Sequence, residues 1–143
     1  MINIKEVIKL KIPYPTINDN LALSSHMYIC KLSHSSNYEY IKCQTLKPYM
    51  IGNAIFQHFV DESPDINRNP FRNPTRIDCD KIFTTESSSY DEALKTELRP
   101  DVCDELFNSI LDELSCDGYA TIKPDEEHIR QLNPLVTLSA SSN

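Results

Sequence analysis

The chain has 143 residues, of which 40% are hydrophobic and 24% charged, and its formal net charge is −7. This composition suits one soluble domain with a real core, and no apolar run approaches the length of a membrane span. The negative net charge excludes a uniformly basic surface, so nucleic acid could bind only at a local positive patch.

The first predicted strand covers residues 4–12, which are rich in β-branched residues. From Ile8 onward, apolar side chains occupy every second position, as in a half-buried strand. Pro13 and Pro15 end the strand, because proline cannot donate a hydrogen bond to a central ladder. Residues 16–25 are then expected to form a polar loop.

A β-hairpin is predicted next, from two runs rich in Tyr, Ile and Cys at residues 23–32 and 38–48. Residues 33–37 between them would form a loop. In an antiparallel pair, the start of the first strand and the end of the second lie at the same open end. We therefore expect His26 and Thr45 to be neighbours in space.

The middle of the chain is less regular. Residues 53–60 fit either a short helix or a strand, because their apolar residues have helical spacing but include types that favour strands. Residues 61–74 hold three prolines and are expected to be a loop. Residues 75–84 alternate as one strand with a charged face. That face carries Arg76, Asp78 and Asp80.

The clearest element is an amphipathic helix predicted over residues 100–114. Acidic residues fill its first turn, apolar residues recur along one face, and Gly118 follows close behind. Residues 125–132 fit a second short helix. Together these elements predict a mainly β (α+β) domain over residues 1–135, with a flexible tail over residues 136–143.

This order of elements resembles the MazF/PemK family of toxin endoribonucleases, from about residue 7 to residue 114. The resemblance implies a small SH3-like β-barrel, a homodimer, an antitoxin-like partner, and metal-independent cleavage of single-stranded RNA. The local patterns that carry it are Ile8–Thr16, Ser25–Cys30, Lys42–Lys47 and Arg76–Thr85.

The resemblance also assigns three catalytic positions. His26 stands where the family has an arginine implicated in cleavage, Thr45 matches its active-site hydroxyl, and Asp80 matches its aspartate. Cleavage through the 2′-hydroxyl needs a base, an acid and a hydrogen-bond donor for the phosphate. His26 suits either proton-transfer role, Thr45 suits the donor, and Asp80 suits orientation of His26 or a second proton transfer. Substrate binding is assigned to Arg72, Arg76 and Gln44, the arginines as a phosphate clamp.

Each of these residues also has a purely structural interpretation. A histidine that begins a strand is often an edge residue, a strand threonine reflects β-propensity, and aspartates on one face are usually solvated. The alternative function is a non-catalytic MazF-like protein that binds a protein partner through its acidic surface.

We expect no metal and no cofactor, because no two Cys or His residues have the short spacing of a structural metal site. The five cysteines form an odd set without a CxxC pair, which favours reduced thiols. The first residues lack the apolar core of a signal peptide, so a cytoplasmic location is expected.

Overall fold

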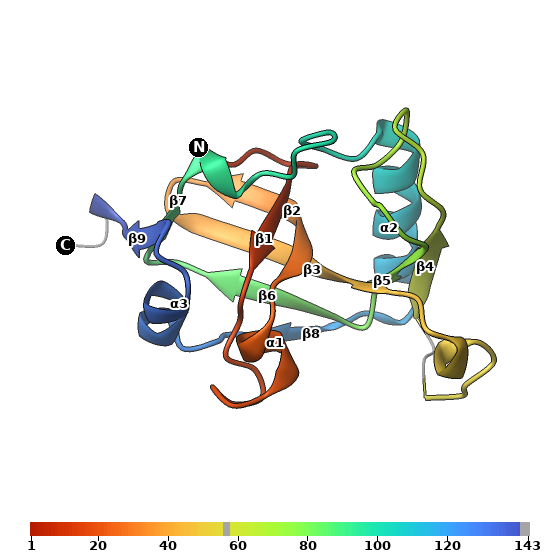
Figure 1. Cartoon of the computed structure of the whole chain (residues 1–143), viewed down its shortest axis with the longest axis horizontal. Coiled ribbons are helices and arrows are strands. Elements are labelled where there is room, and N and C mark those ends of the chain that lie inside the picture. Colours follow the sequence, from red (N-terminus) through yellow and green to blue (C-terminus); the bar gives the residue numbers. More distant parts are fainter. Residues whose placement is uncertain (56–57, 141–143) are drawn as a thin grey trace.

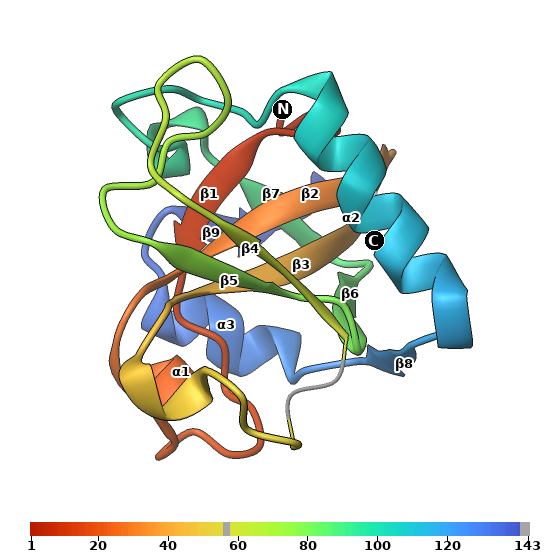
Figure 2. The same cartoon turned by 90° about the vertical axis from the view of Figure 1, so that its right-hand side faces the viewer.

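A computed structural model describes residues 1–55 and 58–140 of the chain. It is mainly β, as predicted: one sheet of seven strands carries a helix on each face (Figures 1 and 2). The strands of this sheet are β1 (Val7–Leu10), β2 (His26–His34), β3 (Asn37–Thr45), β4 (Phe59–Glu62), β5 (Thr75–Asp78), β6 (Lys81–Thr85) and β8 (Ala120–Ile122). A second, two-stranded sheet pairs β7 (Ser88–Tyr90) with β9 (Val136–Leu138). The helices are α1 (Asn20–Leu23), α2 (Asp104–Asp117) and α3 (Glu126–Leu132), with the 3-10 turns η1 (Pro48–Met50) and η2 (Glu92–Leu94).

The strand order is β1-β2-β3-β5-β4, with every neighbouring pair antiparallel. β6 also pairs with β3, and β8 joins β6 in the parallel direction. Among the described residues β1 forms no ladder with β4 or β8, so the sheet stays open and no closed barrel is found.

The predicted hairpin is confirmed, although its turn is shorter than expected. β2 and β3 are joined by two residues, Ser35 and Ser36, and Ser35 takes the left-handed conformation with φ of 55°. The ladder extends almost to the turn, because His34 still pairs with Asn37. Of the five residues expected to form the loop, Ser33 and His34 belong to β2 and Asn37 belongs to β3.

The prediction of one strand over residues 75–84 is wrong, because the segment forms two. β5 pairs with the C-terminal end of β3, where Thr75 lies opposite Thr45. β6 pairs with the N-terminal part of β3. Cys79 and Asp80 separate the two strands. Of the ambiguous segment 53–60, the structure places residues 59 and 60 in β4, while residues 56 and 57 lie outside the described residues.

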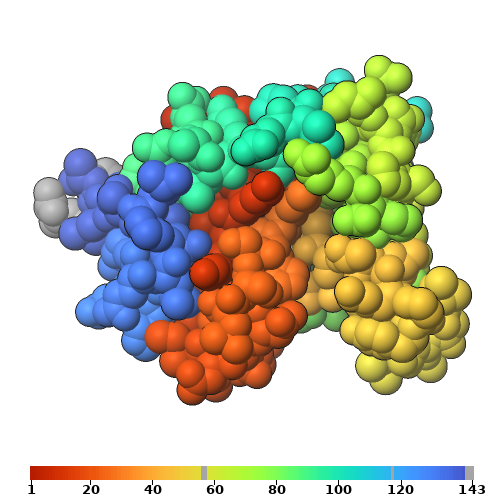
Figure 3. All heavy atoms as spheres, in the orientation of Figure 1, coloured from red at the N-terminus to blue at the C-terminus, as the bar shows by residue number. Residues whose placement is uncertain are grey.

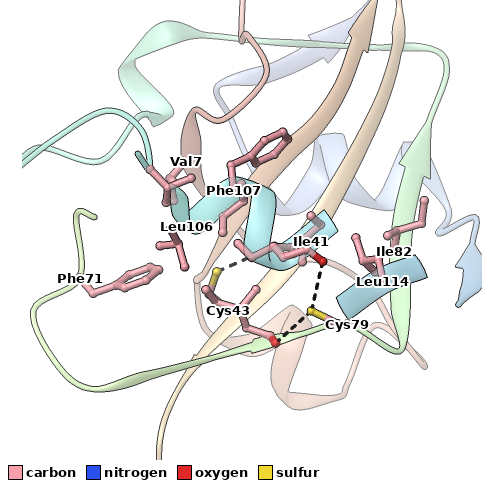
Figure 4. Close-up of a cluster of buried hydrophobic side chains, with 13 residues drawn as sticks. Val7, Ile41, Cys43, Phe71, Cys79, Ile82, Leu106, Phe107 and Leu114 are labelled. Atoms are coloured by element: carbon pink, nitrogen blue, oxygen red, sulfur yellow. Dashed lines mark hydrogen bonds between the residues drawn. The ribbon is translucent and has the colours of Figure 1, made fainter. Parts of the chain in front are cut away.

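The predicted amphipathic helix is confirmed as α2. It starts after Cys103, whose Sγ accepts the backbone N–H of Leu106 at 3.4 Å, and it ends at Gly118 with φ of 74°. Its apolar face packs on the sheet in a core that unites α2 with β1, β2, β3, β5 and β6 (Figure 4). The core residues that Figure 4 labels are Val7, Ile41, Cys43, Phe71, Cys79, Ile82, Leu106, Phe107 and Leu114.

A second core lies on the opposite face of the sheet, under α3 and β9. It contains Tyr28, Tyr40 and Phe83 together with Ile129 of α3 and Val136 of β9. The tail predicted to start at residue 136 therefore begins with a paired strand whose first residue is buried. Residues 141–143 lie outside the described residues.

Asn133 joins this C-terminal part to the end of β1. It is 7% exposed, and its amide accepts from Lys11 N at 2.9 Å and donates to Lys11 O at 2.7 Å and Ile129 O at 2.8 Å. Asn133→Ala should lower the free energy of unfolding by about 1–3 kcal/mol, because buried backbone groups lose their partners. Urea denaturation measures this. Gln131→Ala, at an exposed position of α3, is the control, and an equal effect of both changes would contradict the role of Asn133.

Candidate functional site

Polar side chains form a row across one end of the sheet, where β2 and β5 begin and β3 ends. Gln44 of β3 lies directly opposite Arg76 of β5. The pairing of Met27 with Cys43 places His26 of β2 beside Gln44 on the other side. Residues opposite one another in an antiparallel pair share a face of the sheet, so His26, Gln44 and Arg76 share one.

A cleft of about 460 Å³ opens at the end of this row, and we call it the His26 cleft. Figure 3 shows it between the N-terminal segment that includes α1, in orange, and the segment that follows β3, in yellow. The predicted residues His26, Gln44, Thr45 and Arg72 all line it. Its other lining residues are Asn20, Ser24, Ser25, Met27, Cys43, Lys47, Tyr49, Met50, Phe71, Asn73 and Thr75.

His26 is held in its basic form. Its Nδ1 lies 3.1 Å from the backbone carbonyl oxygen of Ser24, and because a carbonyl only accepts, Nδ1 carries the proton and Nε2 the lone pair. Burial lowers the pKa of His26 below 6.5, and the charge of Lys42 adds to this against the opposing effect of the Ser24 hydrogen bond. The ring is therefore mostly neutral at pH 7.

Thr45 and Arg72 line the cleft from the end of β3 and from the segment before β5. Thr45 is the exposed last residue of β3, opposite the buried Thr75 that begins β5. Arg72 is exposed and follows Phe71, which is 3% exposed and anchored in the core beneath. The hydroxyl of Thr75 donates to Asn73 O at 2.8 Å and so fixes the backbone between these residues.

Arg76 cannot serve as the expected phosphate clamp, because the protein itself occupies its guanidinium. The side chain is almost fully buried, and its Nε and Nη2 donate to the two carboxylate oxygens of Asp61 at 2.8 and 2.9 Å. Its Nη1 donates to Met50 O at 3.0 Å, and its guanidinium lies over the ring of Phe59. Arg76 thus anchors η1 at the edge of the cleft.

Asp80 lies apart from His26. It is exposed, bonds to Lys81 at 3.0 Å, and lines a separate space of about 160 Å³, the Asp80 hollow. Gln44 lines both spaces and is the only predicted residue that connects them. The expectation that Asp80 orients His26 is therefore not met, because the Ser24 carbonyl holds the ring.

Asp78, by contrast, is buried and lies beside the row, two residues after Arg76 in β5. Its carboxylate bonds to Lys42 Nζ at 2.8 Å and accepts from Gln44 Nε2 at 3.1 Å. Because Gln44 donates its amide nitrogen to Asp78, its Oε1 is left as an acceptor. The expectation that Asp78 belongs to a solvated face is wrong.

Lys47 and Tyr49 were not among the predicted site residues, although both line the His26 cleft and are exposed. The available signal was their place at the predicted end of the hairpin, on either side of Pro48. In the described part of the chain no group of three His, Cys, Asp or Glu side chains is gathered as a metal site requires.

Within residues 1–55 and 58–140, no helix combines the length and the apolar character needed to cross a bilayer. Comparison with protein-family models, with curated proteins and with solved structures found no match to this chain.

Proposed function

We propose that this protein binds and cleaves single-stranded RNA in the His26 cleft, without a metal. The proposal takes the chain as a diverged relative of the MazF/PemK toxins, with an open form of the SH3-like barrel. A homodimer and an antitoxin-like partner belong to the same proposal and rest on the sequence resemblance.

The observation that carries the proposal is the charge of the cleft. The chain has 21 acidic and 14 basic residues, yet no carboxylate is among the described residues that line the cleft. The lining instead includes Lys47, Arg72 and His26, with amides of Asn and Gln between them. A cationic cleft in an acidic protein attracts phosphate groups, and the exposed ring of Tyr49 offers a surface for base stacking.

The chemistry follows from the groups in the cleft. His26 Nε2 takes the proton from a ribose 2′-hydroxyl, and the 2′-oxygen attacks the adjacent phosphorus. The bond to the 5′-oxygen breaks, and that oxygen takes a proton from water. The products are a 2′,3′-cyclic phosphate and a 5′-hydroxyl, while Arg72 and the Thr45 hydroxyl stabilise the negative charge on the phosphate.

The alternative function, capture of a protein partner through the acidic surface, has less support. At the start of α2, Asp104 pairs with Lys5 and Glu105 with Arg68, and further along Glu113 lies 3.4 Å from His58. Paired carboxylates present a weaker field to a basic partner.

When single-stranded RNA is incubated with the protein in the presence of a metal chelator, the fragments should end in 2′,3′-cyclic phosphate. Arg72→Gln should lower kcat/KM about 10- to 100-fold, because a charged hydrogen bond to the phosphate is worth about 1.5–3 kcal/mol. Thr45→Ala should lower it about threefold to tenfold, as a neutral donor contributes less.

Lys123→Gln is the matched control, since it removes one exposed charge outside the cleft. Absence of cleavage and of RNA binding in the wild type, or equal losses in Arg72→Gln and Lys123→Gln, would refute the proposed function.

A further inference from the structure

The cations of this chain divide into those with a partner and those without. Lys42, Lys81, Lys95 and most of the arginines are held by carboxylates, and Arg130 is held by serine oxygens. Among the described residues, the Lys and Arg side chains without a carboxylate or hydroxyl partner are Lys9, Lys11, Lys47, Arg72 and Lys123.

Four of these five cations line two adjoining spaces. Lys47 and Arg72 line the His26 cleft, while Lys9 and Lys11 line a space of about 340 Å³ that we call the Lys9 hollow. Ser25 lines both. In Figure 3 the β1 segment, in red, lies between the orange segment and the blue C-terminal segment, on the face where the His26 cleft opens.

The fold holds Lys9 and Lys11 on this face. Ile8 and Leu10 are buried in the core under α3, so the alternation of β1 turns Lys9 to the other face, which it shares with its partner Met27 in the lining of the His26 cleft. Lys11 follows the end of β1 and lines the same hollow as Lys9. The backbone of Lys11 is fixed at both its N–H and its C=O by the Asn133 amide. Position and charge are thus set before any ligand binds.

The other charged residues of the Lys9 hollow contribute little positive charge. Lys95 is neutralised by Glu6 at 2.8 Å and by Glu92 at 3.1 Å, and Glu97 is the single carboxylate of the described lining. The described lining of the hollow thus carries three lysines and one carboxylate, and Lys9 and Lys11 are the two lysines without a carboxylate partner, so cations outnumber carboxylates here as in the His26 cleft.

We propose that one RNA strand lies across both spaces, with phosphates at Lys47 and Arg72 in the His26 cleft and further phosphates at Lys9 and Lys11. This inference rests on the proposed function and adds to it the path and length of the substrate. On this path a trinucleotide covers the His26 cleft alone, whereas a decamer extends to the Lys9 hollow.

The test compares binding of a trinucleotide and a decamer of single-stranded RNA, each non-cleavable through 2′-O-methyl groups, across about 50–200 mM salt. For the decamer, Lys9→Gln/Lys11→Gln should reduce the slope of log K against log salt by about 1.4, since each single-strand phosphate contact contributes about 0.7. The same scaling predicts about 25-fold weaker binding at 0.1 M salt. Trinucleotide binding should not change.

The control is the pair of single changes Lys11→Gln and Lys123→Gln, which remove the same charge. Equal effects of the two on the decamer would overturn the proposed path, because only net charge would then matter. A decamer that binds no more tightly than the trinucleotide would also overturn it, while leaving cleavage in the His26 cleft intact. Failure of both oligomers to bind would instead refute the proposed function.

An acidic peptide provides the remaining comparison. Polyglutamate of similar charge should bind more weakly than the decamer, because it offers no bases for the amides and Tyr49 of the His26 cleft. Equal affinity and equal salt dependence for the two ligands would overturn the assignment of the path to RNA.

Discussion

Cleavage of RNA is expected to slow by about 10²- to 10⁴-fold when His26 is replaced by alanine, the range typical of a lost general base. The ring is half-buried in the cleft, and its Nδ1 is committed to Ser24. Only Nε2 can then accept the 2′-proton. Single-turnover rates on a saturating decamer measure the loss, and binding of the non-cleavable decamer should change by less than tenfold.

The pH dependence should show the same group. Burial lowers the pKa of His26 from 6.5, so the neutral base predominates already below neutral pH. We expect the rate to rise with pH in the acidic range and to level off before pH 7, and this rise should be absent in His26→Ala. The lowered pKa also means that the folded protein binds fewer protons than the unfolded chain, so His26 contributes stability that is lost as the pH falls.

His34→Ala supplies the control, because His34 is exposed at the turn of the hairpin, at the other end of the same strand. Its cleavage rate and pH profile should match those of the wild type. A His26→Ala protein that keeps the wild-type rate, or loses activity together with its fold, would remove His26 from the chemistry.

The second large effect is expected on stability, from Asp78→Ala. The side chains of Lys42 and Asp78 are 13% and 9% exposed and bond at 2.8 Å. Removing one partner leaves the ammonium in a mostly buried position without its counter-charge, at a cost of about 3–5 kcal/mol. Guanidinium denaturation with linear extrapolation measures the change in the free energy of unfolding.

Asp80→Ala is the matched control two residues along, with the same change in net charge. Its side chain is 53% exposed and pairs with Lys81 in solvent, so a loss below about 1 kcal/mol is expected. The double change Lys42→Met/Asp78→Leu should restore much of the stability, because both buried charges are then gone. Equal losses in Asp78→Ala and Asp80→Ala would contradict this account.

The sequence predicted best what depends on local patterns. Two runs rich in Tyr, Ile and Cys within residues 23–48 were enough to predict the hairpin, and antiparallel geometry then placed His26 and Thr45 at the same end, where both line the cleft. The spacing of apolar residues predicted α2. These patterns involve residues that are close in the sequence, so they do not depend on the rest of the fold.

The division of the charged strand could not be predicted in this way. Alternation assigned Arg76, Asp78 and Asp80 to one face, but it does not say which element covers that face. Arg76 is buried because Asp61, from a segment expected to be a loop, lies opposite it in β4. Asp80 is separated from Asp78 because β3 is shared between two partner strands.

The sequence could not predict which cations lack a carboxylate partner. The sequence does not distinguish Lys9 from Lys95. In the structure Lys95 forms ion pairs with two carboxylates, whereas Lys9 forms none among the described residues. Which cation remains available to a ligand is decided by contacts between distant segments. The net charge of −7 was compatible with a local positive patch, but only the structure shows which cations form it.

β3 is hydrogen-bonded along both edges, to β2 on one side and to β5 and β6 on the other, whereas residues 51–55, which follow the anchored turn η1, belong to no ladder. An inserted residue within β3 would shift two ladders at once, but a change within the mostly exposed residues 51–55 leaves both ladders in place. Grafting other sequences into that segment is thus a practical way to redirect which ligands the protein recognises.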